Sequence, residues 1–227
     1  MSTNSPFMSK DHHKNSKDEI DARMDANNVS GKMKEYIHRC VAFHSSPAPG
    51  VLISAFMVDY AMDLLSVTPD MKLYAVCETP KCAPDALQVI AHCTTGNNRL
   101  RVVPIGKFAI TLNAATHEVT PDNTAMAIRV YVDLNKLKKF PVIDTWYANS
   151  PAFDKPTMKD TLQSEIFRAG REILSFGRVR VAIIHKLKWE SVTCPDCGET
   201  VPDYLAMDGR CGGCGSMKYY EKIADQK

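Results

Sequence analysis

A chain of 227 residues is long enough for one well-packed core and a small accessory unit, but too short for two large domains. Its content of 44% hydrophobic and 24% charged residues is that of an ordinary globular protein, and a formal net charge of +2 provides no electrostatic reason to expect binding to nucleic acid or an anionic membrane. Length, composition and net charge therefore limit the possible architecture, whereas the function has to be inferred from individual sequence motifs.

The first thirty residues are rich in Asn, Ser, Asp and Lys and contain almost no aromatic side chains. Because such a segment can bury little apolar surface, residues 1–30 are predicted to form a disordered tail. The segment has neither the apolar stretch nor the cleavage site of a secretory signal, so a cytoplasmic location is expected. In that compartment the eight cysteines are expected to be metal ligands, reactive thiols or buried side chains rather than disulfides.

The most apolar stretch, "GVLISAFMVDYAMDLL", runs from Gly50 to Leu65. Hydrophobic residues recur at spacings of three and four along it, as on one face of a helix, and most other positions are apolar too. The stretch is too short to span a bilayer and carries Asp59 and Asp63, so no membrane association is expected. It is predicted to be a buried central helix.

A strand–helix–strand pattern follows the central helix. A helix is predicted over Ala83–His92, with Pro84 in its first turn, where the missing N–H is not needed. The tight turn "PIG" before Lys107 predicts a hairpin between the two strands on either side of it. Runs of β-branched and apolar residues predict strands at residues 72–78, 98–104, 107–113 and 125–134.

The last part of the core contains a connection, a helix and a strand. Residues 144–160, "DTWYANSPAFDKPTMKD", are turn-rich and are predicted to form a long surface connection. An amphipathic helix is predicted over Thr161–Ser175, and a strand over residues 178–189. Together these elements predict an α+β core at residues 31–185, with helices packed on a mixed, mostly antiparallel sheet, followed by a small module at residues 186–227.

The C-terminal module holds the most specific motif in the chain. Two Cys-x-x-Cys pairs, separated by thirteen residues, can wrap four thiolates around one ion, which suits zinc best and rubredoxin-type iron second. No coordination position is left for water, so one structural Zn²⁺ is predicted, and its binding would supply folding energy to a unit this small. A helix in the tail at residues 216–227 would make the module treble-clef-like. The predicted ligands are Cys194, Cys197, Cys211 and Cys214.

Three further thiols lie in "CETPKCAPDALQVIAHC". Cys82 is predicted at a helix start, a position that lowers a thiol pKa. A continuous helix would separate Cys82 from Cys93 by roughly 16 Å, which excludes a disulfide or a shared ion between them. Cys77 can approach Cys82 across the corner "ETPK". A thiol redox protein that uses these two cysteines is therefore one hypothesis for the function, although the Cys-x-x-Cys signature of such proteins is absent.

Part of the chain resembles the E-subunit family of formylmethanofuran dehydrogenase. The resemblance covers about residues 35–107 and rests on "FHSSPAPG" before the apolar helix, "CAPDALQVIAHCTTG" after it, and "GK" at Gly106 and Lys107. Several family members also end in a four-cysteine zinc finger. The resemblance implies an α+β core and a role in anaerobic one-carbon metabolism related to methanogenesis, without implying a settled reaction.

The resemblance also implies a core pocket. Its residues here are His44, Cys82, Asp85 and Cys93, which would bind a second metal ion or a small one-carbon ligand. Where the family pattern has a second His and a Cys, this chain has Ser46 and Ala48.

The sequence leaves a second interpretation open. The departures at Ser46 and Ala48 favour a non-catalytic accessory or regulatory module whose finger binds a protein partner or nucleic acid. Two lysines beside Tyr219 and Tyr220 make a weak basic patch, so a protein partner is the stronger expectation and nucleic acid the weaker. The resemblance implies a homodimer.

Overall fold

The computed structural model describes residues 10–115, 124–182 and 188–221, and the chain separates into two compact units, Met1–Ile183 and Ile184–Lys227. The division falls close to the predicted boundary after residue 185. In the first unit the elements are α1 (Lys10–Ala26), α2 (Gly31–His44), α3 (Pro49–Leu65), β1 (Leu73–Cys77), α4 (Ala83–Ile90), β2 (Leu100–Val102), β3 (Ala109–Ala114), β4 (Thr124–Val132), α5 (Leu134–Leu137), α6 (Pro141–Tyr147), α7 (Lys155–Ala169) and β5 (Leu174–Ala182).

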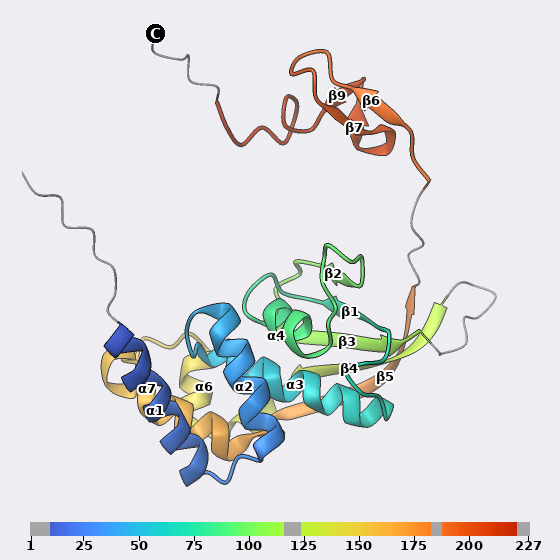
Figure 1. Ribbon diagram of the computed structural model, residues 1–227. Helices are drawn as coiled ribbons and strands as arrows, with labels where there is room; N and C mark the ends of the chain where they lie inside the picture. The colour runs from blue at the N-terminus through green and yellow to red at the C-terminus, as the bar shows by residue number, and fades with distance from the viewer. Residues whose placement is uncertain (1–9, 116–123, 183–187, 222–227) are drawn as a thin grey trace, which may run out of the picture. The chain divides into compact units, whose positions relative to one another are not determined.

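Helix α3 is the central element of the first unit, as its apolar sequence predicts. Pro49 occupies the first turn, where its missing N–H costs no hydrogen bond, and Ser66 ends the helix in a left-handed conformation. Most of its residues are buried, because the helix packs on β3 and β4 and is covered by α2, α4 and α7 (Figure 1). The core of the unit therefore lies around α3.

The sheet is mixed and mostly antiparallel, in the order β2-β1-β3-β4-β5. β2 runs parallel to β1, with Ala75 opposite Leu100, while the other neighbouring strands are antiparallel. The hairpin predicted around "PIG" is wrong, because β2 and β3 lie on opposite sides of β1. Helix α4 carries the chain from β1 across to β2, and the turn at Gly106, with φ of 81°, then leads back to β3.

The N-terminal segment contains a helix where the sequence predicts disorder. In α1, Ile20 and Met24 are buried, and Arg23 donates to Gln163 at 3.0 Å and pairs with Asp160 at 2.8 Å, both on α7. The prediction of a disordered tail is therefore wrong for this helix, while residues 1–9 lie outside the described residues. The segment carries too few apolar residues for a composition argument to detect that it docks on α7.

The predicted surface connection at residues 144–160 is also largely helical. Pro141 starts α6, and Asp154 caps α7 by accepting from the N–H of Thr157 at 3.3 Å. Helix α7 ends at Ala169, earlier than predicted, because Gly170 has φ of 49° and turns the chain toward β5. These boundaries depend on caps that the apolar pattern does not encode.

The second unit is built from short strands. They are β6 (Ser191–Thr193), β7 (Thr200–Pro202), β8 (Ala206–Met207) and β9 (Arg210–Cys211), with a 3-10 turn η1 (Asp203–Leu205). β6 pairs with β7 and β8 with β9, both antiparallel. The predicted tail helix is absent from residues 216–221, and the rest of it falls outside the described residues. Across the whole described chain, no helix combines the length and the apolar character that a bilayer crossing requires.

Candidate functional site

The four cysteines of the second unit lie on two tight turns. In the first, the N–H of Gly198 donates to the carbonyl of Cys194 at 2.9 Å. Gly198 has φ of 75°, a conformation in which a side chain would be strained. In the second turn, the N–H of Cys214 donates to the carbonyl of Cys211 at 3.1 Å. Each turn therefore presents its two thiols on one side.

The four sulfur atoms converge as ligands of a single ion would. All lie within 4.8 Å of one another, and the Sγ atoms of Cys197 and Cys211 are 3.8 Å apart. A tetrahedral ion with zinc–sulfur bonds of about 2.3 Å would separate its sulfurs by about 3.8 Å. The four cysteines therefore fit a tetrahedral metal ion. Among the described residues, no other group of three or more His, Cys, Asp or Glu side chains converges closely enough to hold a metal ion.

The electrostatics of the cluster also favour a cation. Hydrogen bonding from the backbone of Cys211 lowers the pKa of Cys194 to about 6, whereas its thiol neighbours, Cys211 first, raise the pKa of Cys214 to about 12. Four thiolates so close together repel one another. A divalent cation would remove that repulsion, because thiolate is the form that binds metal.

In the first unit, the structure brings two of the four predicted core residues into direct contact. His44 is the last residue of α2, and Asp85 lies in the first turn of α4. The Nδ1 atom of His44 lies 2.6 Å from Oδ2 of Asp85, and each side chain is about one-quarter exposed. A carboxylate on Nδ1 fixes the orientation of the imidazole and leaves Nε2 for a ligand or a proton.

Cys82 adjoins this pair, but its thiol differs from the sequence prediction. It precedes α4 with φ of 54°, and it lies against Gly50 at the start of α3. Burial, followed by the negative charge of Asp85, raises its pKa. The predicted lowering of this pKa is therefore wrong, because desolvation and the carboxylate outweigh the partial charge of the helix start.

The other core thiols face elsewhere. The thiol of Cys93 donates to the carbonyl of Leu73 at 3.3 Å, and that of Cys77 to the carbonyl of Thr79 at 3.1 Å. Leu73 and Cys77 are the two ends of β1, about 13 Å apart at 3.3 Å per residue. Cys93 is therefore separated from the corner of His44, Asp85 and Cys82, and burial raises its pKa to about 12.

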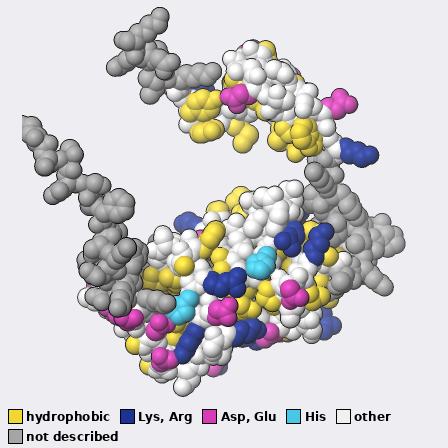
Figure 2. Space-filling view, viewed as in Figure 1, with side chains coloured by type: hydrophobic (Ala, Val, Ile, Leu, Met, Phe, Trp, Pro, Cys, Tyr) yellow, Lys and Arg dark blue, Asp and Glu magenta, His cyan; other side chains and the backbone are white. Residues whose placement is uncertain are grey.

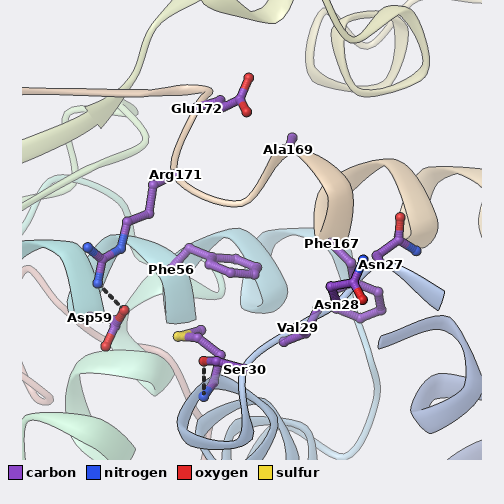
Figure 3. A pocket seen from close by; sticks show the side chains of 11 residues that line it. Asn27, Asn28, Val29, Ser30, Phe56, Asp59, Phe167, Ala169, Arg171 and Glu172 are labelled. Carbon is purple, nitrogen blue, oxygen red and sulfur yellow. Dashed lines mark hydrogen bonds and ion pairs between the residues drawn. The ribbon is translucent and has the colours of Figure 1, made fainter. Parts of the chain in front are cut away.

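Two features of the first unit were missed at the sequence level. Glu78, directly after β1, accepts two hydrogen bonds from Arg129 of β4, at 2.5 and 2.7 Å. An open surface hollow is lined by residues of the α1–α2 connection, α3 and the end of α7 (Figure 3). The ion pair and the hollow both depend on residues far apart in the chain, so no local sequence motif predicts them.

Comparison with known proteins adds a family and two relatives. Residues 43–180 match the family model FmdE, described as the molybdenum formylmethanofuran dehydrogenase operon family. The chain is similar to the crystal structure of a tungsten formylmethanofuran dehydrogenase FmdE-like protein from Syntrophus aciditrophicus, with a TM-score of 0.68 and 33% identity, over 83% of this chain and 95% of that one.

A curated relative comes from Archaeoglobus fulgidus. It is named a probable S-adenosyl-L-methionine-binding protein and is 29% identical over 210 residues, which are 85% of this chain. The match covers 56% of that protein, so the chain spans about half the length of this relative.

Proposed function

The chain belongs to the FmdE family, and on that premise we propose that it is a zinc-binding protein of anaerobic one-carbon metabolism. The observation that carries the metal part of the proposal is the convergence of four sulfur atoms within 4.8 Å. The ion would be Zn²⁺, held by Cys194, Cys197, Cys211 and Cys214, with a structural role because the protein already supplies four ligands.

The corner of His44, Asp85 and Cys82 is the proposed ligand site of the core. These side chains do not place three metal-binding atoms within 4.8 Å, whereas a catalytic zinc usually has three protein ligands. We therefore propose that the corner binds a small one-carbon ligand by hydrogen bonding rather than a second metal. A partly exposed imidazole held by a carboxylate can donate or accept a proton at Nε2.

Metal analysis tests this assignment. Purified protein is expected to contain one zinc per chain, and replacing Cys194 and Cys197 with serine should remove it. The matched control is Cys82→Ser, which changes a thiol outside the finger and should retain the zinc. A second equivalent that survives in the double variant and is lost in Asp85→Ala would overturn the metal-free corner. Loss of zinc in the control alone would overturn the finger site.

An accessory role with the finger as a docking element is the alternative within the same family. The finger exposes large hydrophobic side chains (Figure 2), which are Trp189, Tyr204, Leu205, Met207, Met217, Tyr219 and Tyr220. Such side chains gather at protein interfaces. We propose a second copy of this chain as the occupant, in line with the homodimer that the family resemblance implies. Sedimentation equilibrium should show a dimer that Met217→Ser and Tyr219→Ser weaken, and a concentration-independent monomer would contradict it.

A second candidate function is binding of S-adenosylmethionine by the core unit. It is supported by the relative named for that ligand, whose match covers 85% of this chain and 56% of that protein. Isothermal titration calorimetry of the full chain with S-adenosylmethionine should give saturable binding at one site per chain. Heats no larger than those of dilution would contradict this candidate and leave the zinc proposal intact.

A further inference from the structure

Strand β5 forms one edge of the five-stranded sheet of the first unit (Figure 1). It pairs with β4 on one side along its whole length, from Leu174 to Ala182, and no described strand lies on its other side. An edge strand presents a row of backbone N–H and C=O groups that can pair with another chain, so protein edges are usually short, bulged or covered. An edge of nine residues is therefore a candidate binding surface.

The hydrogen bonds of the sheet identify which backbone groups lie at this edge. The N–H of Asp133, just after β4, donates to the carbonyl of Ile173 at 2.9 Å. Because backbone groups alternate between the two sides of a strand, the odd-numbered residues of β5 bond to β4 and the even-numbered residues face outward. The carbonyl of Leu174 agrees with this, since it accepts from Nζ of Lys136 at 2.5 Å. Among the described residues, nothing bonds to the outward backbone groups of residues 176, 178, 180 and 182.

The exposed side chains along this edge are basic. Arg178 and Arg180 are both exposed on one face of the sheet, and neither forms an ion pair with a described residue. Their neighbours on β4 are Ile128 and Met126, so the adjacent strand offers no acidic group to offset the two charges. Phe176 continues the row and is also exposed. The edge therefore combines unbonded backbone groups with two unpaired positive charges and an aromatic side chain.

The two arginines disfavour a second copy of this chain at the edge. In any two-fold antiparallel pairing of β5 with itself that joins three or more of the outward residues, an arginine of one chain lies opposite an arginine of the other. Like charges that face each other across two strands destabilise a sheet, whereas opposite charges stabilise it. The charge of the edge therefore favours an acidic strand from another protein.

We propose that the outer edge of β5 binds an extended acidic segment of another protein by β-strand addition. The main chain of that segment hydrogen-bonds to the outward groups of β5, and acidic side chains at alternate positions lie opposite Arg178 and Arg180. The residues between them face the other side of the sheet, beside Gly177 and Val179, where β-branched side chains fit. This surface involves none of the zinc ligands and none of the residues of the proposed core corner.

Fluorescence anisotropy with a labelled peptide tests the proposal on the full chain. The peptide alternates glutamate and valine and is as long as β5. Binding is expected to saturate at one peptide per chain and to weaken as the salt concentration is raised, because the facing charges are exposed. A peptide with lysine in place of glutamate is the control and should bind roughly tenfold more weakly.

Methylation of the peptide backbone tests the strand pairing itself. In the proposed pairing the N–H groups of the glutamates point toward β5, whereas those of the valines point away from it. N-methylation of the glutamates should therefore weaken binding roughly tenfold or more, since several hydrogen bonds are lost. N-methylation of the valines is the matched control and should leave the affinity nearly unchanged. Equal affinity of the two methylated peptides would overturn strand addition.

Protein variants test the location. Arg178→Gln combined with Arg180→Gln should weaken binding of the glutamate peptide roughly two- to thirtyfold, the range for two exposed ion pairs. The matched control, Lys138→Gln combined with Lys139→Gln, removes two exposed charges elsewhere in the same unit.

Weaker binding in the arginine variant alone supports the edge of β5. Equal weakening in the lysine variant overturns the location, because the effect would then follow from net charge. A lack of peptide binding to the unmodified protein overturns the proposal, and the arginines would then only protect the edge from pairing. A dimer in sedimentation that excludes the peptide would assign the edge to a second copy and also overturn it.

Discussion

Gly50 lies where α3 begins, directly against Cys82. A Cβ atom at this position would lie 2.9 Å from Sγ and 3.0 Å from Cβ of Cys82, closer than side-chain atoms pack. The glycine therefore sets the distance between α3 and the corner that precedes α4. An alanine would have to push the two elements apart.

We expect Gly50→Ala to lower the free energy of unfolding by about 1–3 kcal/mol, the usual cost of overpacking a core. Urea denaturation measures it. Gly31→Ala is the control, because nothing lies within 4 Å of that added Cβ and α2 should become slightly more stable. Adding Cys82→Gly, which suits the φ of 54°, should recover much of the loss, whereas simple additivity of the two changes would contradict the clash.

The thiols of the first unit are expected to react slowly. Burial raises the pKa of Cys40 and Cys93 to about 12 and that of Cys77 to about 11. At pH 8 only about one thiol in a thousand to ten thousand would be ionised, and the thiolate is the nucleophile. Alkylation by iodoacetamide, followed by mass spectrometry on the metal-loaded protein, should label the half-buried Cys82 first, at a rate that rises with pH. Labelling of Cys82 at pH 7 as fast as in urea would contradict its raised pKa.

The candidate site was only partly predictable from individual residues. His44 and Asp85 lie 41 positions apart, and the resemblance to a family placed them in one pocket, where the structure also brings them together. Cys93 was grouped with them but lies against the other end of β1. The pKa of Cys82 could not be predicted, because sequence shows a helix start but not the burial beside Gly50.

Among the elements, β1 and β4 are linked across β3 by an ion pair. Arg129 binds both carboxylate oxygens of Glu78, and this partner is the main reason that the pKa of Glu78 lies below its ordinary value. A carboxyl group with a depressed pKa in the folded state stabilises the protein fully above its unfolded pKa. That stabilisation is lost as the pH falls through the folded pKa.

Glu78→Gln is therefore expected to lower the free energy of unfolding at pH 7 by roughly 1.5–3 kcal/mol, as for a lost charged hydrogen bond. The difference from the unmodified protein should shrink progressively as the pH is lowered below about 4.5. Denaturation curves at several pH values measure this, with Glu35→Gln as an exposed control. A difference that persists unchanged in acid would show that the ion pair is not its source.

The elements themselves were predictable where a pattern repeats over many residues. The central helix α3 and strand β1 follow from apolar periodicity. The pairing of β2 was not predictable, because a turn before Lys107 is compatible with either side of β1. Helix α1 was missed because only a few of its side chains, such as Ile20 and Met24, are buried. The start of α7 depends on the cap at Asp154 rather than on hydrophobic pattern.

At the scale of the whole molecule, the chain consists of two units with different sources of stability. The first has an extensive buried core around α3, while the second has short strands and four converging thiols. A unit of about forty residues seldom folds on apolar burial alone. Metal binding should therefore stabilise the second unit selectively.

We expect chelation, or replacement of Cys194 and Cys197 with serine, to unfold the second unit while the melting temperature of the first changes by only a few degrees. Hydrogen exchange followed by mass spectrometry distinguishes unfolding of the second unit from unfolding of the first. Peptides from residues 188–221 should lose protection, and those from α3 should keep it. The control is Asp208→Asn, which alters an exposed finger residue but none of the predicted ligands. Global loss of protection would contradict the independence of the two units.

The connectivity of the sheet has a consequence for the order in which it forms during folding. The segment β1–α4–β2 completes its pairing within residues 73–102, whereas β4 and β5 pair along nine residues although residues 133–173 intervene. Closing that long connection costs more chain entropy before any pairing compensates for it. Pulse-labelled hydrogen exchange during refolding should therefore show protection in β1 before β5. A chain paused during synthesis just after α6 would already contain β1 to β4, and the outer edge of β4 would stay open until β5 is made.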